Sequence, residues 1–502
     1  MNRNLIVFLA ASMLSSAAHA VTFNVTRTDD PVPDGCKASD CSLREAVIDA
    51  NGDAAEDLIL LPAGVFLLDL VGEFDDSENT GDLDISTDMN FAGAPSIIDG
   101  QNLIRIMEIH SGANVTLMDL TLRNAMQTYN SGALQITGGS LVLDAVTFDS
   151  NSAGGSGSAI YAGEGAIVDI DDCLFTNNSG GSGTSIHING NLTVRNTIFR
   201  ANEAAEFGDR GSVAYISGST SDALFENVTF DQNSAVGDGG AIVFLGRKLR
   251  IDGLVATANH SDAQGGVVFV SGSSHTKQLE IVNAVFNGNS ADEGGAISFG
   301  GGASDTLDIR HSSFVSNSSD GWGGAVKITG GTVDVTNSTF SGNQTTDTGG
   351  AIHLFGDELT VQHSTFSGNS AANGGDAMYI RDIASFGNNL IDGECFVFDP
   401  LDVTSLGGNV EGNGDTCDLD AGSDLVNQSS EQLGLQPLRD NIGATPTHEL
   451  TSGSVARGQG ETTICESVMV DQLYDKRGSE CNSGAVESNR IFRDGFESGI
   501  VL

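Results

Sequence analysis

The chain repeats one short motif, Phe-x-x-Asn, at nearly regular intervals through its middle. Successive motifs are separated by as few as 24 residues (Phe175 to Phe199) and as many as 31 (Phe199 to Phe230). Because a unit this short cannot bury its own apolar side chains, neighbouring units must stack and bury them together. The aromatic positions are Phe148, Phe175, Phe199, Phe230, Phe286, Phe314, Phe340 and Phe366, with Ala256 taking the place in one unit. The nine asparagine positions are Asn151, Asn178, Asn202, Asn233, Asn259, Asn289, Asn317, Asn343 and Asn369.

Each unit also contains a Gly-Gly-Ala-Ile segment and a stretch of alternating polar and apolar residues, such as residues 359–366. In a strand this alternation sends Leu359 and Val361 to one side and Thr360 to the other. The period of two argues against helices, the sequence lacks the Leu-x-x-Leu-x-Leu pattern of a leucine-rich horseshoe, and a propeller blade needs about 40 residues or more. The sequence therefore predicts an all-β, right-handed parallel β-helix with about nine regular coils.

The repeated residues have distinct expected roles in such a stack. The phenylalanines should form one internal column. The asparagines suit a turn, because they tolerate left-handed backbone and their amides can hydrogen-bond along the stack. Paired glycines, as at 294–295, permit the sharp corner before the next strand. Cys173, which also lies in a repeat, is predicted to be a small buried hydrophobe.

The N-terminus has the composition of a secretory signal. Arg3 precedes an apolar stretch at residues 5–14, and Ala18-His19-Ala20 has the small residues of a cleavage site. We expect cleavage between Ala20 and Val21. No later stretch is apolar and long enough to span a membrane, so the sequence predicts no transmembrane segment in the mature chain.

Residues 41–52 predict a short helix that closes the open N-terminal end of the stack. Ser42 and Glu45 form an S-x-x-E capping box, and an apolar face follows over residues 43–50. Asn51-Gly52 is expected to end the helix in a left-handed turn. A capping helix protects the first strands from edge-to-edge pairing with other chains.

Three stretches resemble known bacterial families. Gly-Gly-Ala-Ile combined with Phe-x-x-Asn, over residues 130–375, resembles the repeats of chlamydial polymorphic outer-membrane proteins. Cys41-Ser-Leu-Arg-Glu-Ala-Val47 resembles the CSLREA motif that opens many secreted β-helix proteins. The C-terminal part of the chain resembles the choice-of-anchor region of the same proteins, over residues 433–441, 445–448, 471–472, 477–478 and 481–487. Asn482 and Ser483 depart from the usual Cys-Asp-Ile-Gly-Ala ending of that region. The resemblance implies export and display at the extracellular or outer-membrane surface of a Gram-negative-type bacterium.

These observations predict five segments. They are a signal peptide (1–20), an N-terminal cap with the CSLREA-like helix (21–56), the parallel β-helix (57–384), an irregular choice-of-anchor-like region (385–487) and a terminal tag (488–502). The tag, Arg490-Ile-Phe-Arg-Asp-Gly-Phe-Glu-Ser-Gly499, resembles a short ending seen on exported bacterial proteins.

Export makes disulfides possible, and six of the seven cysteines fall into near neighbours. Their spacings lack paired CxxC motifs, which argues against structural zinc. The candidate pairs are Cys36 with Cys41, Cys395 with Cys417, and Cys465 with Cys481.

Acidic residues outnumber basic ones by 67 to 22, which gives a formal net charge of −45. That charge repels nucleic acid, anionic lipid and acidic polymers over most of the surface, so no nucleic-acid partner is expected. It leaves weak calcium binding open, although no Asp-x-Asp-x-Asp-Gly loop or RTX nonapeptide occurs in the sequence. We expect no other cofactor.

The weak catalytic candidates are Asp171 and Asp172, the only adjacent acidic pair within a repeat strand. Many β-helices cut acidic polysaccharides, and lyases of that kind need carboxylates for calcium and an Arg or Lys as base. The alternative is that Asp172 is a turn residue, in the column that Asn196 and Asn227 occupy in other units. Trp322 could stack on a sugar but is expected to pack.

Fold does not settle function, and three hypotheses stay open. We favour a non-catalytic, adhesin-like protein that binds cell-surface or extracellular polysaccharide or protein, because the repeats are regular and show no evident cluster of acids and bases. The second is a pectate-lyase-like polysaccharide lyase or a glycoside hydrolase. The third is a structural component of the envelope.

Overall fold

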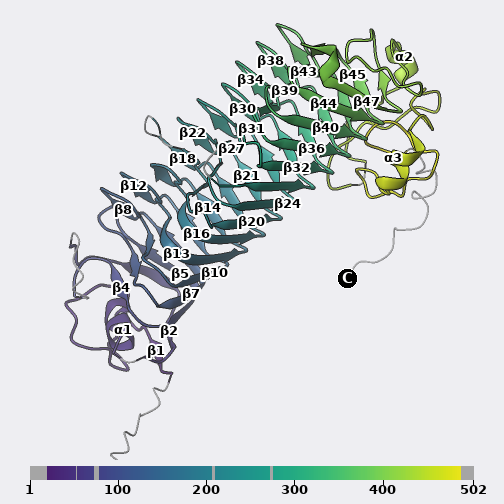
Figure 1. The fold of residues 1–502 in the computed structure, drawn as a ribbon. Coiled ribbons are helices and arrows are strands. Elements are labelled where there is room, and N and C mark those ends of the chain that lie inside the picture. Colours follow the sequence, from purple (N-terminus) through teal and green to yellow (C-terminus); the bar gives the residue numbers. More distant parts are fainter. Residues whose placement is uncertain are drawn as a thin grey trace, which may run out of the picture.

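A computed structural model describes residues 20–487, except 53, 73–78, 206–207, 209, 272–274 and 442. The chain is a right-handed parallel β-solenoid, in which every named strand pair is parallel and each coil lies on the one before it (Figure 1). The predicted signal peptide, apart from Ala20, and the terminal tag lie outside the described residues.

Each coil contributes strands to four ladders that run along the solenoid. The outer face of ladder 1 carries the candidate functional site. It comprises β4 (Leu83–Ile85), β6 (Met107–Ile109), β9 (Leu134–Ile136), the start of β13 (Ile160–Asp171) and of β16 (Ile186–Arg195), β19 (Ala214–Ile216), β23 (Ile242–Phe244), β27 (Val268–Ser271), β31 (Ile297–Gly300), β35 (Val326–Ile328), β39 (Ile352–Leu354), β43 (Met378–Ile380) and β46 (Cys395–Val397).

Ladder 2 follows ladder 1 around the coil. It comprises β1 (Thr22–Asn24), β2 (Asp57–Leu61), the starts of β5 (Met89–Asp99) and β7 (Asn114–Arg123), β10 (Ser140–Asp144), the ends of β13 and β16, β20 (Asp222–Glu226), β24 (Lys248–Asp252), β28 (Gln278–Val282), β32 (Thr306–Arg310), β36 (Thr332–Thr336), β40 (Glu358–Gln362), β44 (Ile383–Gly387) and β47 (Val403–Gly407).

Ladder 3 carries the Phe-x-x-Asn phenylalanines, and ladder 4 is a ten-stranded sheet of very short strands. Ladder 3 comprises β3 (Gly64–Leu67), the ends of β5 and β7, β11 (Thr147–Asp149), β14 (Leu174–Thr176), β17 (Ile198–Arg200), β21 (Thr229–Asp231), β25 (Val255–Thr257), β29 (Val285–Asn287), β33 (Ser313–Val315), β37 (Thr339–Ser341), β41 (Thr365–Ser367), β45 (Leu390–Asp392) and β48 (Val410–Glu411). Ladder 4 comprises β8 (Met126–Gln127), β12 (Ser152–Ala153), β15 (Ser179–Gly180), β18 (Glu203–Ala204), β22 (Ser234–Ala235), β26 (His260–Ser261), β30 (Ser290–Ala291), β34 (Ser318–Ser319), β38 (Gln344–Thr345) and β42 (Ser370–Ala371).

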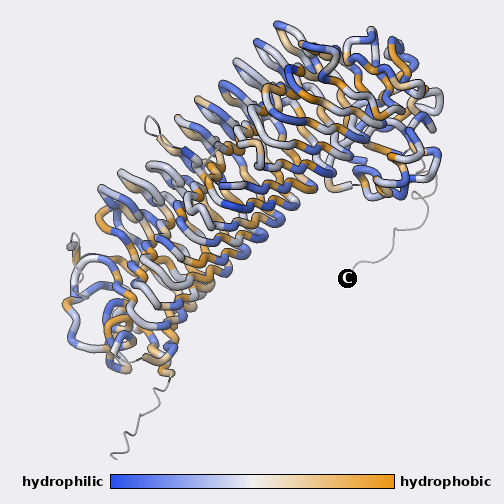
Figure 2. The backbone as a smooth tube through the Cα atoms, in the orientation of Figure 1, coloured by the Kyte–Doolittle hydropathy of each residue, from blue (hydrophilic) through white to orange (hydrophobic). Residues whose placement is uncertain are grey.

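The core follows the alternation that the sequence predicted, and hydrophobic and hydrophilic positions alternate along the coils (Figure 2). The phenylalanine column is fully buried, and most neighbouring rings stack, as Phe314 does on Phe340 at 4.7 Å between ring centroids, whereas Phe199 and Phe230 meet edge to face. Ala256 pairs with Phe230 on one side and Phe286 on the other, as expected from its place in the repeat.

The asparagine column forms a buried ladder of side-chain amides. The Asn178 side chain, for example, donates to the Asn202 Oδ1 at 2.9 Å and to the Phe148 carbonyl at 3.1 Å. The expectation of left-handed backbone at the asparagines themselves is wrong, because the residue before each of them takes that conformation, as Asn177 does with φ of 54°. The asparagine is thereby turned inward, where its amide can bond along the stack.

The N-terminal cap is built around α1 (Leu43–Ala50), which lies at one end of the solenoid (Figure 1). The capping box of Ser42 and Glu45 forms, and Arg44 is buried in an ion pair with Asp30. The expected left-handed turn at its end is absent, since Asn51 caps the helix with φ of −64°. The Asn51 side chain instead bonds the first coil, donating to the Asp84 carbonyl.

The coils continue past the boundary that the sequence placed at residue 384. Strands β44 to β48 pair with the preceding coil, and the last ladder pairing is at Glu411. The boundary was set too early because this coil lacks the Phe-x-x-Asn motif and has Leu390-Ile391 in its place. At the other end, β1 already pairs with β2 inside the predicted cap.

After the 3-10 turn η1 (Pro400–Asp402), the described residues beyond 411 form two short helices, α2 (Ser430–Leu433) and α3 (Thr462–Ser467). This C-terminal region folds back onto the outer face of ladder 3, where the Ser313 hydroxyl donates to the Pro446 carbonyl and the Thr339 hydroxyl to the Gln472 side chain.

Three disulfides form, joining Cys36 to Cys41, Cys395 to Cys417, and Cys465 to Cys481. Within the described part of the chain, no helix is long and apolar enough to cross a membrane.

Candidate functional site

The acidic pair nominated from the sequence does not converge on a site. Asp171 ends β13 and accepts a hydrogen bond from the Asn196 side chain at 2.8 Å. Asp172 is an exposed turn residue with φ of 51°, in the same column as Asn196 and Asn227, which have φ of 49° and 54°. The turn interpretation therefore describes Asp172, and the pair lies at the end of ladder 2.

Three arginines on successive parts of ladder 2 form ion pairs with carboxylates of neighbouring coils. Arg195 contacts Asp169 and Glu226, and Arg250 contacts Asp252 and Glu280. Arg310 also pairs with Glu280. Each of the three guanidinium groups is therefore paired with at least one carboxylate of a neighbouring strand.

The polar and aromatic side chains that do lie close together are on the outer face of ladder 1. The central outward position of each strand pairs with the same position in the next coil and makes one continuous column. From the N-terminal to the C-terminal end this column reads Asp84, Glu108, Gln135, Tyr161, His187, Tyr215, Val243, Phe269, Ser298, Lys327, His353, Tyr379 and Phe396.

The N-terminal end of the column is an acidic cluster of Asp82, Asp84 and Glu108, joined by Arg105 and His110. Arg105 pairs with Asp82 at 2.5 Å and with Glu108, and it also donates to the Gln135 side chain. The three carboxylates and Arg105 are all buried. The Arg105 guanidinium is buried and held by two carboxylates, so a polymer could not reach it. Arg105 is therefore not a candidate catalytic base for cleaving a polysaccharide.

The C-terminal end of the column is aromatic. Trp322 stacks on His353 with 5.0 Å between ring centroids, His353 on Tyr379 at 4.9 Å, and Tyr379 on Phe396 at 4.7 Å. The Lys327 ammonium lies 5.6 Å from the centre of the Trp322 ring. Trp322 thus packs as expected, but it remains 37% exposed and extends a surface of stacked rings.

His353 is a neutral member of this stack. The pKa of its imidazole is lowered to about 4, mainly by burial; Asp347 opposes this shift, and the positive charges of Lys327 and Arg381 add to it. Its ring is 3% exposed, and its Nδ1 has no hydrogen-bond partner among the described residues.

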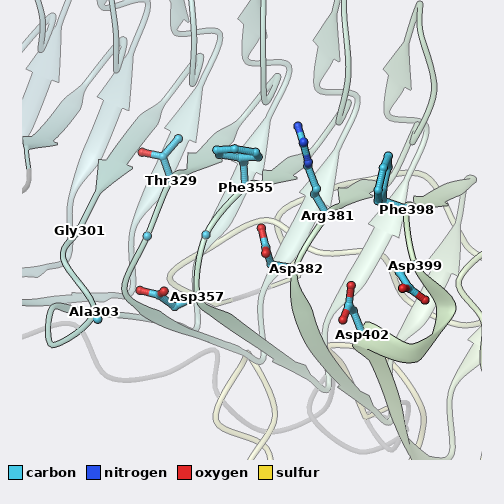
Figure 3. A pocket seen from close by; sticks show the side chains of 12 residues that line it. Gly301, Ala303, Thr329, Phe355, Asp357, Arg381, Asp382, Phe398, Asp399 and Asp402 are labelled. Atoms are coloured by element: carbon cyan, nitrogen blue, oxygen red, sulfur yellow. The ribbon is translucent and has the colours of Figure 1, made fainter.

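A second outward row lies beside the column, two residues further along each strand. Phe355, Arg381 and Phe398 occupy successive coils and line an open groove of about 680 Å³ (Figure 3). The Arg381 guanidinium lies 4.6 Å from the centre of the Phe355 ring and 5.4 Å from that of Phe398. Arg381 is therefore sandwiched between two exposed rings, with its positive charge over their electron-rich faces.

The floor of the groove is acidic. Four carboxylates line it next to the row of Phe355, Arg381 and Phe398; they belong to Asp357, Asp382, Asp399 and Asp402 (Figure 3). Four carboxylates against one guanidinium give this groove an excess of negative charge. We call the surface formed by Trp322, His353, Phe355, Tyr379, Arg381, Phe396 and Phe398 the aromatic face.

The aromatic face has parts for binding rather than for bond cleavage. Flat rings offer stacking surfaces, and carboxylates accept hydrogen bonds from hydroxyl or amino groups. The sequence interpretation missed Phe355, Arg381 and Phe398. The available signal was positional, because each stands two residues after the central outward residue of its strand, as Phe355 stands after His353.

The fold is also found in comparisons with known proteins. Residues 131–336 match the family described as right handed beta helix region, and residues 337–354 match the Chlamydia polymorphic membrane protein repeat. No curated protein matches the chain. Among solved structures, the crystal structure of pectate lyase Pel9A is 14% identical, with 95% of this chain and 98% of that chain covered and a TM-score of 0.32. A likeness this distant has no bearing on activity.

Proposed function

We propose that this protein is an exported, adhesin-like β-helix that binds a surface polymer along its aromatic face and does not cut it. The observation that carries the proposal is the row of Phe355, Arg381 and Phe398 on successive coils, beside a second stack of aromatic rings. Because neighbouring coils are spaced by about 4.8 Å, such a row presents a regular linear surface to a linear ligand.

The charge of the groove narrows the class of polymer. Uronate chains would meet the four carboxylates of the floor and a chain whose formal net charge is −45. Neutral glycans would instead stack on the rings and donate hydroxyl hydrogen bonds to the carboxylates, and amino-bearing glycans would add ion pairs. We therefore propose a neutral or amino-bearing glycan as the ligand.

We also propose that the protein is displayed at the bacterial surface after signal cleavage between Ala20 and Val21. Support comes from the polymorphic membrane protein repeat at residues 337–354 and from the CSLREA-like and choice-of-anchor-like segments of the sequence. N-terminal sequencing of protein recovered from intact cells should begin at Val21. A mature protein that begins at Met1 and stays inside the cell would contradict this part of the proposal.

A binding assay with purified protein tests the aromatic face. Immobilised neutral glucan, chitosan and pectate would be compared, and we expect retention on at least one of the first two and none on pectate. Phe355→Ala with Phe398→Ala should weaken binding by about tenfold or more, because one aromatic contact contributes about 1 kcal/mol. Ile167→Ala is the matched control, since Ile167 is 54% exposed on ladder 2 and should leave binding unchanged.

Three results would count against the proposal. Equal binding by the double variant and the wild type would remove the aromatic face from the contact. Turnover of uronate polymers in calcium, abolished by Asp172→Ala, would instead establish the lyase alternative. A deletion strain with unchanged attachment but a weakened envelope would favour the structural alternative.

A further inference from the structure

The acidic cluster beneath the N-terminal cap has more negative charge than its partners neutralise. Asp84 lies on β4 directly beside Glu108 on β6, and oxygen atoms of Asp82, Asp84 and Glu108 lie within 4.8 Å of one another. All three residues are at least nine-tenths buried. Arg105 offers one positive charge to three carboxylates, and among the described residues its ion pairs are with Asp82 and Glu108.

Asp84 is the carboxylate that the protein leaves incompletely satisfied. Its Oδ1 lies 3.2 Å from His110 Nε2, whereas its Oδ2 is buried with no hydrogen-bond partner among the described residues. A buried carboxylate oxygen without a donor is costly, because buried charges in proteins are paired or bind metal ions.

We propose that Asp82, Asp84 and Glu108 bind one divalent cation, and that calcium is the ion they take. All three offer oxygen ligands, which hard cations prefer, and the cluster contains no thiolate. Calcium accepts six to eight oxygens in flexible geometry, so carboxylates from two neighbouring strands and water molecules can complete its shell. The orphaned Asp84 Oδ2 supplies the ligand atom that no protein donor occupies.

The location gives this site a structural consequence. The carbonyls of Gly81 and Asp82 accept hydrogen bonds from Arg44 of α1 at 2.7 and 3.1 Å, and the Asp84 carbonyl accepts one from Asn51 at 2.7 Å. The same backbone stretch thus supports both the helix and the carboxylates. Calcium would fix the cap onto the first coils and stabilise the end of the solenoid where unfolding can begin.

Calcium titration of the full mature chain at pH 7.5 tests this inference. Isothermal titration should show one saturable site, and calcium should raise the Tm by about 2 °C or more above its value in EDTA. Asp84→Asn should remove that calcium-dependent shift, and in EDTA it should melt higher than the wild type because it relieves the crowding of three buried carboxylates. Asp308→Asn, which alters an acidic residue of a regular coil paired with Arg310, should keep the full calcium response.

The wild-type titration decides the matter even if a variant fails to fold. No heat of binding together with equal melting in calcium and EDTA would overturn the proposal. If calcium raised the Tm of Asp84→Asn and of Glu108→Gln as much as it raises that of the wild type, the effect would come from diffuse surface charge. That result would also overturn the proposal. Neither result depends on glycan binding, so the outcome is separate from that of the function proposed above.

Discussion

His353 shows how a single residue can make a ring stack depend on pH. Its imidazole lies between Trp322 and Tyr379, is almost fully buried, and has its pKa lowered from 6.5 to about 4. A charged imidazole would face Lys327 and Arg381, with only Asp347 opposing them. The stack is therefore stable only while this ring is neutral.

Because the unfolded chain binds the proton at higher pH than the fold does, the stabilisation by His353 is complete above pH 6.5 and is lost as the pH falls toward 4. The difference of about 2.5 pKa units corresponds to about 3 kcal/mol at pH 4. We expect His353→Phe to lose less stability than the wild type between pH 6.5 and 4 in denaturant unfolding. Parallel pH profiles would contradict this. His260→Phe, at a half-exposed histidine, is the control and should follow the wild type.

At the scale of elements, the corners of the coil are held by ladders of polar side chains. Asn233 is typical: its amide donates to the Asn259 Oδ1 and the Phe199 carbonyl, and its own Oδ1 accepts from Asn202. A second row of polar side chains, at the turn between strand ladders 2 and 3, uses hydroxyl groups. There the Ser312 N–H donates to the Ser338 Oγ. Such ladders satisfy buried polar groups that the turns would otherwise leave unpaired.

Replacing Asn233 with alanine should be costly. The change leaves the buried amide of Asn202 and the Phe199 carbonyl without these partners, and each unsatisfied buried group costs about 1–3 kcal/mol. We expect a loss of about 2–4 kcal/mol in the free energy of unfolding. Asn287→Ala, at an exposed position on β29, should cost less than about 0.5 kcal/mol. Equal effects of the two changes would show that the ladder adds nothing beyond the turn.

On the scale of the whole molecule, the C-terminal region is a cover for ladder 3. In two uncovered coils the first outward position of that ladder holds an exposed apolar residue, Ile198 or Val255. In the covered coils it holds Ser313, Thr339 and Thr365, all buried. The stretches 471–472 and 477–487 make these contacts, so the motifs that resemble an anchoring region also hold the solenoid.

Arg477 joins this cover to the coils. Its side chain is fully buried, pairs with Glu487 at 2.5 Å and donates to the Asn337 side chain at 2.9 Å. Burial raises the pKa of the Glu487 carboxyl group, and the positive charge of Arg477 is the largest influence that opposes this rise.

Arg477→Ala should therefore cost about 3–5 kcal/mol, because it leaves the buried Glu487 carboxylate without its charged partner. Limited proteolysis should then cut within residues 412–487 while the far-ultraviolet signal of the β-helix persists. Arg439→Ala removes an exposed ion pair with Glu449 and should leave the digestion pattern unchanged. If the Arg477 variant resisted protease as the wild type does, the region would not depend on this residue for docking.

The sequence by itself determined the coil, its inward columns and the cysteine pairing. Period-two alternation and the recurrence of Phe148 to Phe366 are local patterns, and stacking identical units leaves one way to bury them. The capping box at Ser42 is equally local, because its two partners lie three residues apart. The end of the solenoid was set too early because its last coil has lost the repeated residues.

Only the tertiary structure decided which outward residues meet. Phe355, Arg381 and Phe398 share a groove, and Asp82 and Glu108 share a cluster, because the lengths of the intervening turns set the register of each coil against the next. Those lengths vary from coil to coil, so spacing along the chain does not give position across the surface. The folding back of residues 412–487 onto ladder 3 depends on contacts more than 100 residues apart, such as Thr339 with Gln472, which no local pattern records.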